Sequence, residues 1–255
     1  MTQTLFGGAQ RVLFVHAHPD DESIWTGGAI ATLNASGASA AVLTLTRGEL
    51  GEISNPALKA LQGTARLAAH RVAELERALI HLGVTEHAIL GEGEARAHDL
   101  PTRVYEDSGM TWAPDGTATA AKTTGENALV RASVAEALAD LINFALVFGA
   151  DALVSYDETG GYGHPDHVFA HQLTRAAAVG LDVPFWCVLP EGSDATQAQV
   201  SRETERYDIN EVLPAKLTAM AEHASQLDVV GSEFVLSGGQ RHEVSGAESY
   251  TRVGH

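Results

Sequence analysis

Two short motifs combine imidazoles and carboxylates at spacings that suit metal chemistry. His18-Pro-Asp-Asp-Glu22 follows the apolar run Val12–Val15, and His164-Pro-Asp-His167 lies a short loop beyond Ala152–Ser155. Proline cannot continue a central strand, so the chain must leave the sheet at each motif. Open α/β sheets bind their ligands at this carboxyl edge. Three adjacent acids repel one another unless a positive charge lies among them, so we predict a metal site where the two motifs meet.

His18, Asp21 and His167 are the predicted ligands. Asp21 lies three residues after His18, and His167 can face inward from the first turn of a helix. Two imidazoles and one carboxylate leave a position open for water, which is typical of a catalytic zinc site. The same ligand set can hold Fe²⁺. The alternative is an acidic turn that only caps the next helix, but two strand ends that both carry His-Pro-Asp favour the metal site.

Four more residues of the motifs could act on a substrate. Asp20 adjoins a ligand without being needed as one, so it is the predicted general base. A protonated His164 could stabilise a developing oxyanion and then protonate a leaving amine. Asp166 could orient an imidazole that binds the metal, and Tyr162, between two glycines, could swing its hydroxyl over the reacting carbonyl. Together these residues predict metal-assisted hydrolysis of an amide or ester.

Three neighbouring residues have less direct expected roles. Glu22 is expected to bond the loop backbone. His16, just before the turn, is expected to be a buried, hydrogen-bonded imidazole. His223, from the C-terminal segment, is a further candidate to reach the site.

The elements that position these motifs alternate between strands and helices. Apolar runs predict buried strands, and apolar residues at helical spacing predict helices. Such an order favours one α/β domain, 1–255, with a largely parallel sheet and helices on both faces. We place the core at about 11–190 and a small elaboration at about 207–255. The predicted strands are 11–17, 40–46, 87–90, 152–155 and 183–189, and the predicted helices are 24–35, 64–82, 127–148, 166–179 and 214–227.

Two segments fall outside this alternation. Residues 91–126 are too long for an ordinary connection, which is typical of a functional lid. In the C-terminal elaboration, Phe234–Leu236 and Tyr250–Val253 are predicted to be edge strands.

Composition limits the class of partner. The chain has 255 residues and a net charge of −17, with 16 Lys and Arg against 33 Asp and Glu. Nucleic acids and anionic membranes need clustered basic residues, so we expect neither as a partner. No apolar run reaches the roughly 18 residues of a membrane span, no signal peptide is visible, and Cys187 is the only cysteine. We expect a cytoplasmic protein with a small, uncharged or cationic substrate, and leave assembly into a homo-oligomer open.

The two motifs resemble those of a known family. Ala17–Glu22 with His164–His167 is similar to the motifs of the zinc-dependent N-acetylglucosaminyl deacetylases related to the enzyme of glycosylphosphatidylinositol biosynthesis. The likeness extends from Arg11 to about Val253. It implies a Rossmann-like fold with zinc at the carboxyl edge of the sheet. The implied activity removes an acetyl group from an N-acetylglucosamine-type sugar.

Further segments resemble the members of that family that deacetylate N-acetylglucosaminyl-inositol in the mycothiol pathway. These segments are Gly48–Glu52, His70–Leu75, Asp107–Met110 and His223–Gln226. The resemblance implies substrate-binding roles for Glu52, Arg71 and Asp107. Taken alone, the same residues are also consistent with a loop cap, a charge on a helix surface and a solvated loop acid.

An amidase, a sugar-binding protein and a nucleotide-binding domain are the three alternative functions. Glu49–Ala57 also resembles a mycothiol S-conjugate amidase, so cleavage of that or another small N-acyl amide stays open. A sugar-binding protein without turnover is disfavoured, because binding alone needs neither Asp20 nor His164. A nucleotide-binding domain is disfavoured because Gly-x-Gly-x-x-Gly is absent from the first strand–helix turn.

Overall fold

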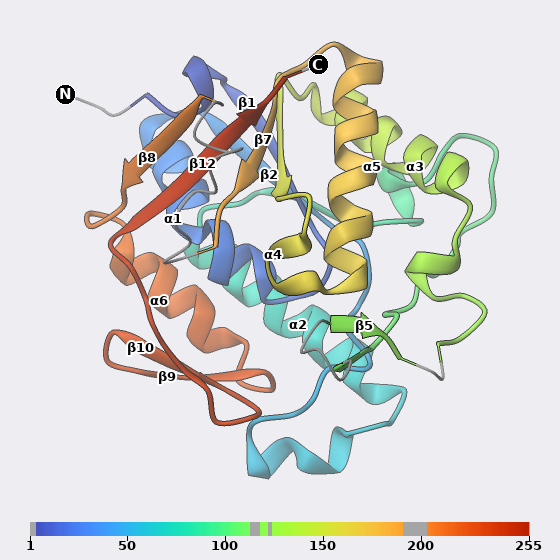
Figure 1. The fold of residues 1–255 in the computed structure, drawn as a ribbon, viewed down its shortest axis with the longest axis vertical. Coiled ribbons are helices and arrows are strands. Elements are labelled where there is room, and N and C mark those ends of the chain that lie inside the picture. Colours follow the sequence, from blue (N-terminus) through green and yellow to red (C-terminus); the bar gives the residue numbers. More distant parts are fainter. Residues whose placement is uncertain (1–3, 113–117, 122–123, 191–202, 255) are drawn as a thin grey trace.

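One seven-stranded sheet forms the centre of the protein in a computed structural model that describes residues 4–112, 118–121, 124–190 and 203–254 (Figure 1). The strand order is β3-β2-β1-β6-β7-β12-β8. The bounds are β1 Arg11–His16, β2 Ser39–Thr44, β3 Glu86–Ile89, β6 Ala152–Tyr156, β7 Phe185–Val188, β8 Thr204–Asp208 and β12 Ala247–Val253.

The first five strands of this order are parallel, and β12 is antiparallel to both β7 and β8. The predicted Rossmann-like, mostly parallel sheet is thus confirmed. The prediction of Tyr250–Val253 as an edge strand is wrong, because β12 lies between β7 and β8. Tyr250 pairs with Val188 on one side and Glu205 on the other. Both neighbouring strands satisfy the backbone of β12, so the C-terminal segment completes the main sheet.

Helices cover both faces of the sheet, as predicted (Figure 1). Leu13 and Val15 of β1 face a core shared with α3 and α5, whereas Val12 and Phe14 face a core shared with α1, α2 and α6. Alternating side chains of one strand therefore enter opposite layers, which explains why β1 is apolar throughout. The helices are α1 Asp21–Ser36, α2 Arg66–His81, α3 Val134–Phe148, α4 Gly160–Gly163, α5 Pro165–Leu181 and α6 Leu213–Glu222.

Two helices are shorter than predicted, and each has a local reason. α3 begins at Val134 because the Ser133 hydroxyl accepts the Glu136 N–H and caps the helix; a separate 3₁₀ turn, Leu129–Arg131, precedes it. α6 ends at Glu222, and the chain turns there into β9. Among the described residues, no helix is long and apolar enough to cross a membrane.

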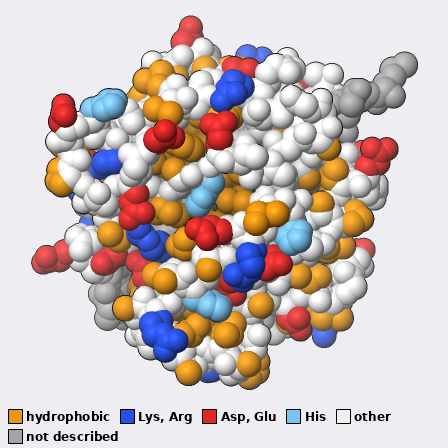
Figure 2. All heavy atoms as spheres, turned by 180° about the vertical axis from the view of Figure 1, so that it is seen from behind, with side chains coloured by type: hydrophobic (Ala, Val, Ile, Leu, Met, Phe, Trp, Pro, Cys, Tyr) orange, Lys and Arg blue, Asp and Glu red, His pale blue; other side chains and the backbone are white. Residues whose placement is uncertain are grey.

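Smaller sheets lie outside the central sheet. Within 91–126 the described residues include a two-stranded ladder, β4 Met110–Trp112 with β5 Ala118–Ala120. The side chain of Trp112 lies outside the described part. A second sheet, beside α6, consists of β9 Leu227–Val230, β10 Glu233–Leu236 and β11 Arg241–Glu243, with β10 in the middle. The prediction of Phe234–Leu236 as an edge strand is therefore also wrong. Figure 2 shows that acidic and basic side chains are interspersed on the face opposite to that of Figure 1.

Candidate metal centre

The two motifs meet where the strand order of the sheet reverses. β1 lies between β2 and β6, so the chain runs outward from β1 through β2 to β3 and later returns to β6 on the other side. In α/β sheets such a switch point opens a crevice beyond the carboxyl ends of the strands. His18 follows β1 there, and α4 and α5 follow β6. The fold therefore brings together residues nearly 150 positions apart.

Three donor atoms form a compact triangle in this crevice. His18 Nδ1 lies 3.2 Å from Asp21 Oδ2 and 3.3 Å from His167 Nε2, and the third edge, Asp21 Oδ2 to His167 Nε2, is 3.3 Å. Ligands about 2.0 Å from a tetrahedral zinc ion are about 3.3 Å apart. The three predicted ligands thus have the spacing of one face of a zinc coordination tetrahedron, with the fourth vertex left for water or substrate.

Hydrogen bonds outside the triangle orient both imidazoles. His18 Nε2 lies 3.2 Å from Asp166 Oδ2, and His167 Nδ1 lies 3.2 Å from the carbonyl oxygen of Gly160. Each ring can donate its N–H to these acceptors and keep a lone pair on the nitrogen in the triangle. Metal-binding histidines are commonly held by a carboxylate or a carbonyl in this way. Asp166 therefore has the position predicted for it.

The charges around the triangle favour a cation. Burial would lower the pKa of His18, but Asp107, Asp166 and Asp21 together raise it well above its usual value. Burial would raise the pKa of Asp21, but His167 and His18 lower it well below its usual value. Two other sets also have ligand atoms within 4.8 Å of one another: His18, His164 and His167, and His18, Asp107, His164 and Asp166. We keep the triangle with Asp21, because its edges of 3.2–3.3 Å match the spacing of zinc ligands.

Asp20 is held in an unusual backbone conformation at the start of α1. Its φ of 118° lies in a region that residues other than glycine rarely adopt. The Arg71 guanidinium lies 3.1 Å from Asp20 Oδ2 and also donates to the carbonyl oxygens of Pro19 and Gly48. Burial raises the pKa of Asp20 to about 6, although Arg71 acts in the opposite direction. A pKa of about 6 suits the general base that we predicted Asp20 to be.

His164 caps α5 beside the triangle. Its Nδ1 accepts the backbone N–H of Asp166 at 3.2 Å, so a neutral ring carries its proton on Nε2. Burial, together with the nearby His18 and His167, lowers the pKa of His164 to about 3. This pKa favours a neutral ring, whereas we predicted a protonated one. Its Nε2–H can still donate to a developing oxyanion.

Asp107 and Tyr162 were also predicted to belong to the site, and both lie beside the triangle. Asp107 is buried rather than solvated, with Oδ1 3.7 Å from His18 Nε2, and it accepts the N–H groups of Gly109 and Leu50. The Tyr162 side chain is 47% exposed, and its ring lies against those of His164 and His167.

Within the described part of the chain, neither Glu52 nor Arg71 hydrogen-bonds or ion-pairs with a residue of the triangle. Glu52 is exposed, and its carboxylate accepts the Ser237 hydroxyl at 3.2 Å. Arg71 is only 3% exposed, so it is not a helix-surface charge.

Tyr156, for which we predicted no role, packs directly on the proposed ligand His167. Its ring stacks on His167 with centroids 4.0 Å apart and planes 7° apart. Its hydroxyl accepts the N–H of Ala17 at 2.8 Å and hydrogen-bonds Asp21. The one available signal was its position at the carboxyl end of a predicted strand.

The expectations for His16 and Glu22 are met. His16 Nε2 lies 2.8 Å from the Thr26 hydroxyl in the core, and Glu22 accepts the backbone N–H of Asp20. His223 also lies next to the motif, 2.7 Å from Glu22.

Comparison with known proteins identifies the family of this chain. A sequence model of the family described as GlcNAc-PI de-N-acetylase (PIG-L) matches residues 13–178. A 1D-myo-inositol 2-acetamido-2-deoxy-alpha-D-glucopyranoside deacetylase of Actinosynnema mirum is 37% identical over 94% of this chain and 90% of its own. The chitobiose deacetylase of Pyrococcus horikoshii has the same fold, with a TM-score of 0.59 and 21% identity over 88% of this chain and 73% of its own. A teicoplanin deacetylase, in a zinc-inhibited form, has a TM-score of 0.64 and 16% identity over 95% of this chain and 97% of its own. The family model covers more than half of the chain, and the Actinosynnema mirum relative is 37% identical over most of both chains. The chain therefore belongs to the PIG-L family of de-N-acetylases.

Proposed function

We propose that this protein is a metal-dependent deacetylase of N-acetylglucosaminyl-inositol. The observation that carries the chemistry is the donor triangle of His18, Asp21 and His167, with edges of 3.2–3.3 Å and with Asp20 adjacent to it in the chain. The relatives named as deacetylases of this inositol glycoside support the substrate. Zn²⁺ is the proposed ion, and Fe²⁺ is compatible with the same ligands.

The residues around the triangle have separate tasks in this reaction. A divalent metal bound there would act as a Lewis acid on the amide carbonyl and would acidify water. Asp20 accepts the proton of the attacking water, and its pKa of about 6 lets it release that proton again to the leaving amine. The Nε2–H of neutral His164 donates to the carbonyl oxygen as negative charge develops. Water adds to the carbonyl carbon, the C–N bond breaks, and acetate and a free amine result.

Substrate placement is assigned to residues at the edge of the site. Tyr162 is exposed beside His164, so its hydroxyl can reach a bound amide. We keep Asp107 and Glu52 as candidates for the sugar hydroxyls, since charge-assisted hydrogen bonds suit a polyhydroxylated, uncharged ligand. Arg71 is proposed to act through Asp20 and the loop at Gly48, because its guanidinium is already bound to protein oxygens.

One assay tests both metal and substrate. The protein is stripped of metal, reloaded with Zn²⁺ or Fe²⁺, and assayed for amine release with fluorescamine. N-acetylglucosaminyl-inositol should react faster than free N-acetylglucosamine, because contacts remote from the amide contribute to the transition state. Equal rates would replace this proposal with a general sugar deacetylase. Faster cleavage of a mycothiol S-conjugate would identify an amidase.

A further inference from the structure

We propose that His223, in the turn between α6 and β9, is a positioning residue of the active site that holds the Glu22 carboxylate against the backbone of Asp20. This inference rests on the proposed role of Asp20 as the base. It adds to the site a residue 200 positions from the first motif, and one outside the span 13–178 that matches the family.

A chain of two short contacts links His223 to Asp20. His223 Nε2 lies 2.7 Å from Glu22 Oε1, and Glu22 Oε2 accepts the Asp20 N–H at 2.9 Å. Glu22 and His223 are both fully buried. The 2.7 Å contact therefore joins two side chains that are shielded from solvent.

The conformation of Asp20 explains why such a pair is needed. A residue other than glycine at a φ of 118° is strained, and strain of about 1–3 kcal/mol persists only when surrounding contacts fix it. Arg71 fixes the side chain of Asp20, and Glu22 fixes its N–H. Without His223, the buried Glu22 carboxylate would lose the ring that contacts it at 2.7 Å. A buried polar group that loses its hydrogen-bond partner tends to turn toward water, and the Asp20 N–H would then lose its acceptor.

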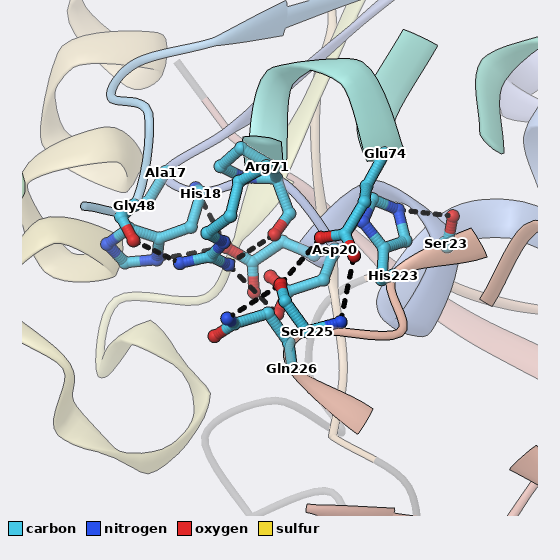
Figure 3. A network of polar contacts seen from close by, with 12 residues as sticks. Ala17, His18, Asp20, Ser23, Gly48, Arg71, Glu74, His223, Ser225 and Gln226 are labelled. Carbon is cyan, nitrogen blue, oxygen red and sulfur yellow. Dashed lines mark hydrogen bonds and ion pairs between the residues drawn. The ribbon is translucent and has the colours of Figure 1, made fainter. Parts of the chain in front are cut away.

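Ser225 lies in the same turn but is bound to α2, so it provides a control for His223. The Ser225 N–H and hydroxyl donate to Glu74 of α2 at 2.8 and 2.6 Å. Figure 3 shows His223 directed toward Ser23, and Ser225 directed toward Glu74. Among the described residues, the Ser225 side chain contacts Glu74 and Gln226 and forms no hydrogen bond with Asp20 or Glu22. Removing its hydroxyl should loosen the same turn without altering the support of the base.

His223 is not the base of a serine nucleophile. Ser23 Oγ and Glu22 Oε1 both face the same ring nitrogen, Nε2, at 3.4 and 2.7 Å. A catalytic triad needs the acid and the hydroxyl on opposite nitrogens. Ser23 is also fully buried. These contacts fit a fixed support and not a proton relay.

The test compares His223→Ala, His223→Gln and Ser225→Ala in the metal-loaded protein. kcat and KM are measured on N-acetylglucosaminyl-inositol, metal content by elemental analysis, and exchange of the Asp20 amide hydrogen by NMR. His223→Ala should keep metal and KM and lose on the order of 10²-fold in kcat, as expected when a catalytic group is misplaced. Its Asp20 amide should exchange at least about tenfold faster, because a hydrogen bond to a charged acceptor is weakened. His223→Gln, which can still donate to Glu22, should recover most of both, and Ser225→Ala should change neither.

Native kcat and native exchange at Asp20 in His223→Ala would overturn the inference. An equal loss of kcat in Ser225→Ala would also overturn it, because the effect would then be general loosening. If the alanine protein does not fold, His223→Met fills the space without a donor and takes its place. Asp20→Ala with native kcat would refute the proposed base instead, and the exchange measurement would still decide whether His223 supports Asp20.

Discussion

Replacing Arg71 with methionine should lower the free energy of unfolding by about 3–5 kcal/mol, the usual effect of breaking a buried ion pair. The guanidinium is 3% exposed and lies 3.1 Å from Asp20 Oδ2. Methionine fills part of the same volume but leaves the Asp20 carboxylate, which is 15% exposed, without its cation. It also leaves the carbonyl oxygens of Pro19 and Gly48 without their donor. We therefore expect kcat to fall together with stability, while metal content is retained.

Arg77 provides the matched control on the same helix. It pairs with Glu222 at 2.7 Å, but its side chain is 50% exposed. Exposed pairs contribute about 0–1 kcal/mol, so Arg77→Met should change stability little and kcat not at all. Unfolding in urea, followed by circular dichroism, measures both variants, and steady-state kinetics separate kcat from KM.

A specific result would refute this reasoning about Arg71. If Arg71→Met is as stable as Arg77→Met and only raises KM, the guanidinium is turned toward substrate in the working enzyme. The direct substrate-binding role implied by the family resemblance would then hold. Arg71→Lys should not restore kcat fully, because an ammonium cannot reproduce the planar fork that reaches several acceptors at once.

Three further predictions concern the metal, the base and pH. His18→Ala and His167→Ala should lose metal by elemental analysis whereas His164→Ala retains it; a metal-free His164 variant would show that the two histidines of the second motif are exchanged in role. Asp20→Ala should keep metal and lose about 10²-fold or more in kcat; near-native turnover would exclude it as the base. Burial lowers the pKa of His171 below its usual 6.5, so folding favours its neutral form and stability should decline as pH falls below 6.5. This slope in the urea-unfolding free energy should be smaller in His171→Asn, and an unchanged slope would assign it to other groups.

The sheet and both motifs could be predicted because their signals are local. Parallel strands covered on both faces are nearly continuous apolar runs, and β1, β2 and β6 follow such runs closely. The proline of each motif marks where the chain leaves the sheet. The start of α3 was missed because apolar residues continue upstream of its true boundary, and the capping hydroxyl of Ser133 sets the first turn.

Contacts between distant segments could not be read from the sequence. β12 lies inside the sheet because β8 pairs with its outer edge, and nothing within Tyr250–Val253 encodes that partner. Arg71 has the charge pattern of a helix-surface residue, yet the turn at Pro19 and the loop at Gly48 enclose it. The stacking of Tyr156 on His167 likewise depends on where α5 lies against β6.

The three consecutive acids of the first motif acquire different chemistry from these distant contacts. Burial raises the pKa of Asp20 to about 6, and Arg71 only partly offsets it. For Asp21 and Glu22 burial acts in the same direction, but the neighbouring histidines reverse it and lower both pKa values. Environments that separate the pKa values of like groups assign their roles. We therefore expect Asp21 and Glu22 to stay ionised in their proposed roles as metal ligand and backbone support, and Asp20 to be the one of the three that takes up and releases a proton near neutral pH.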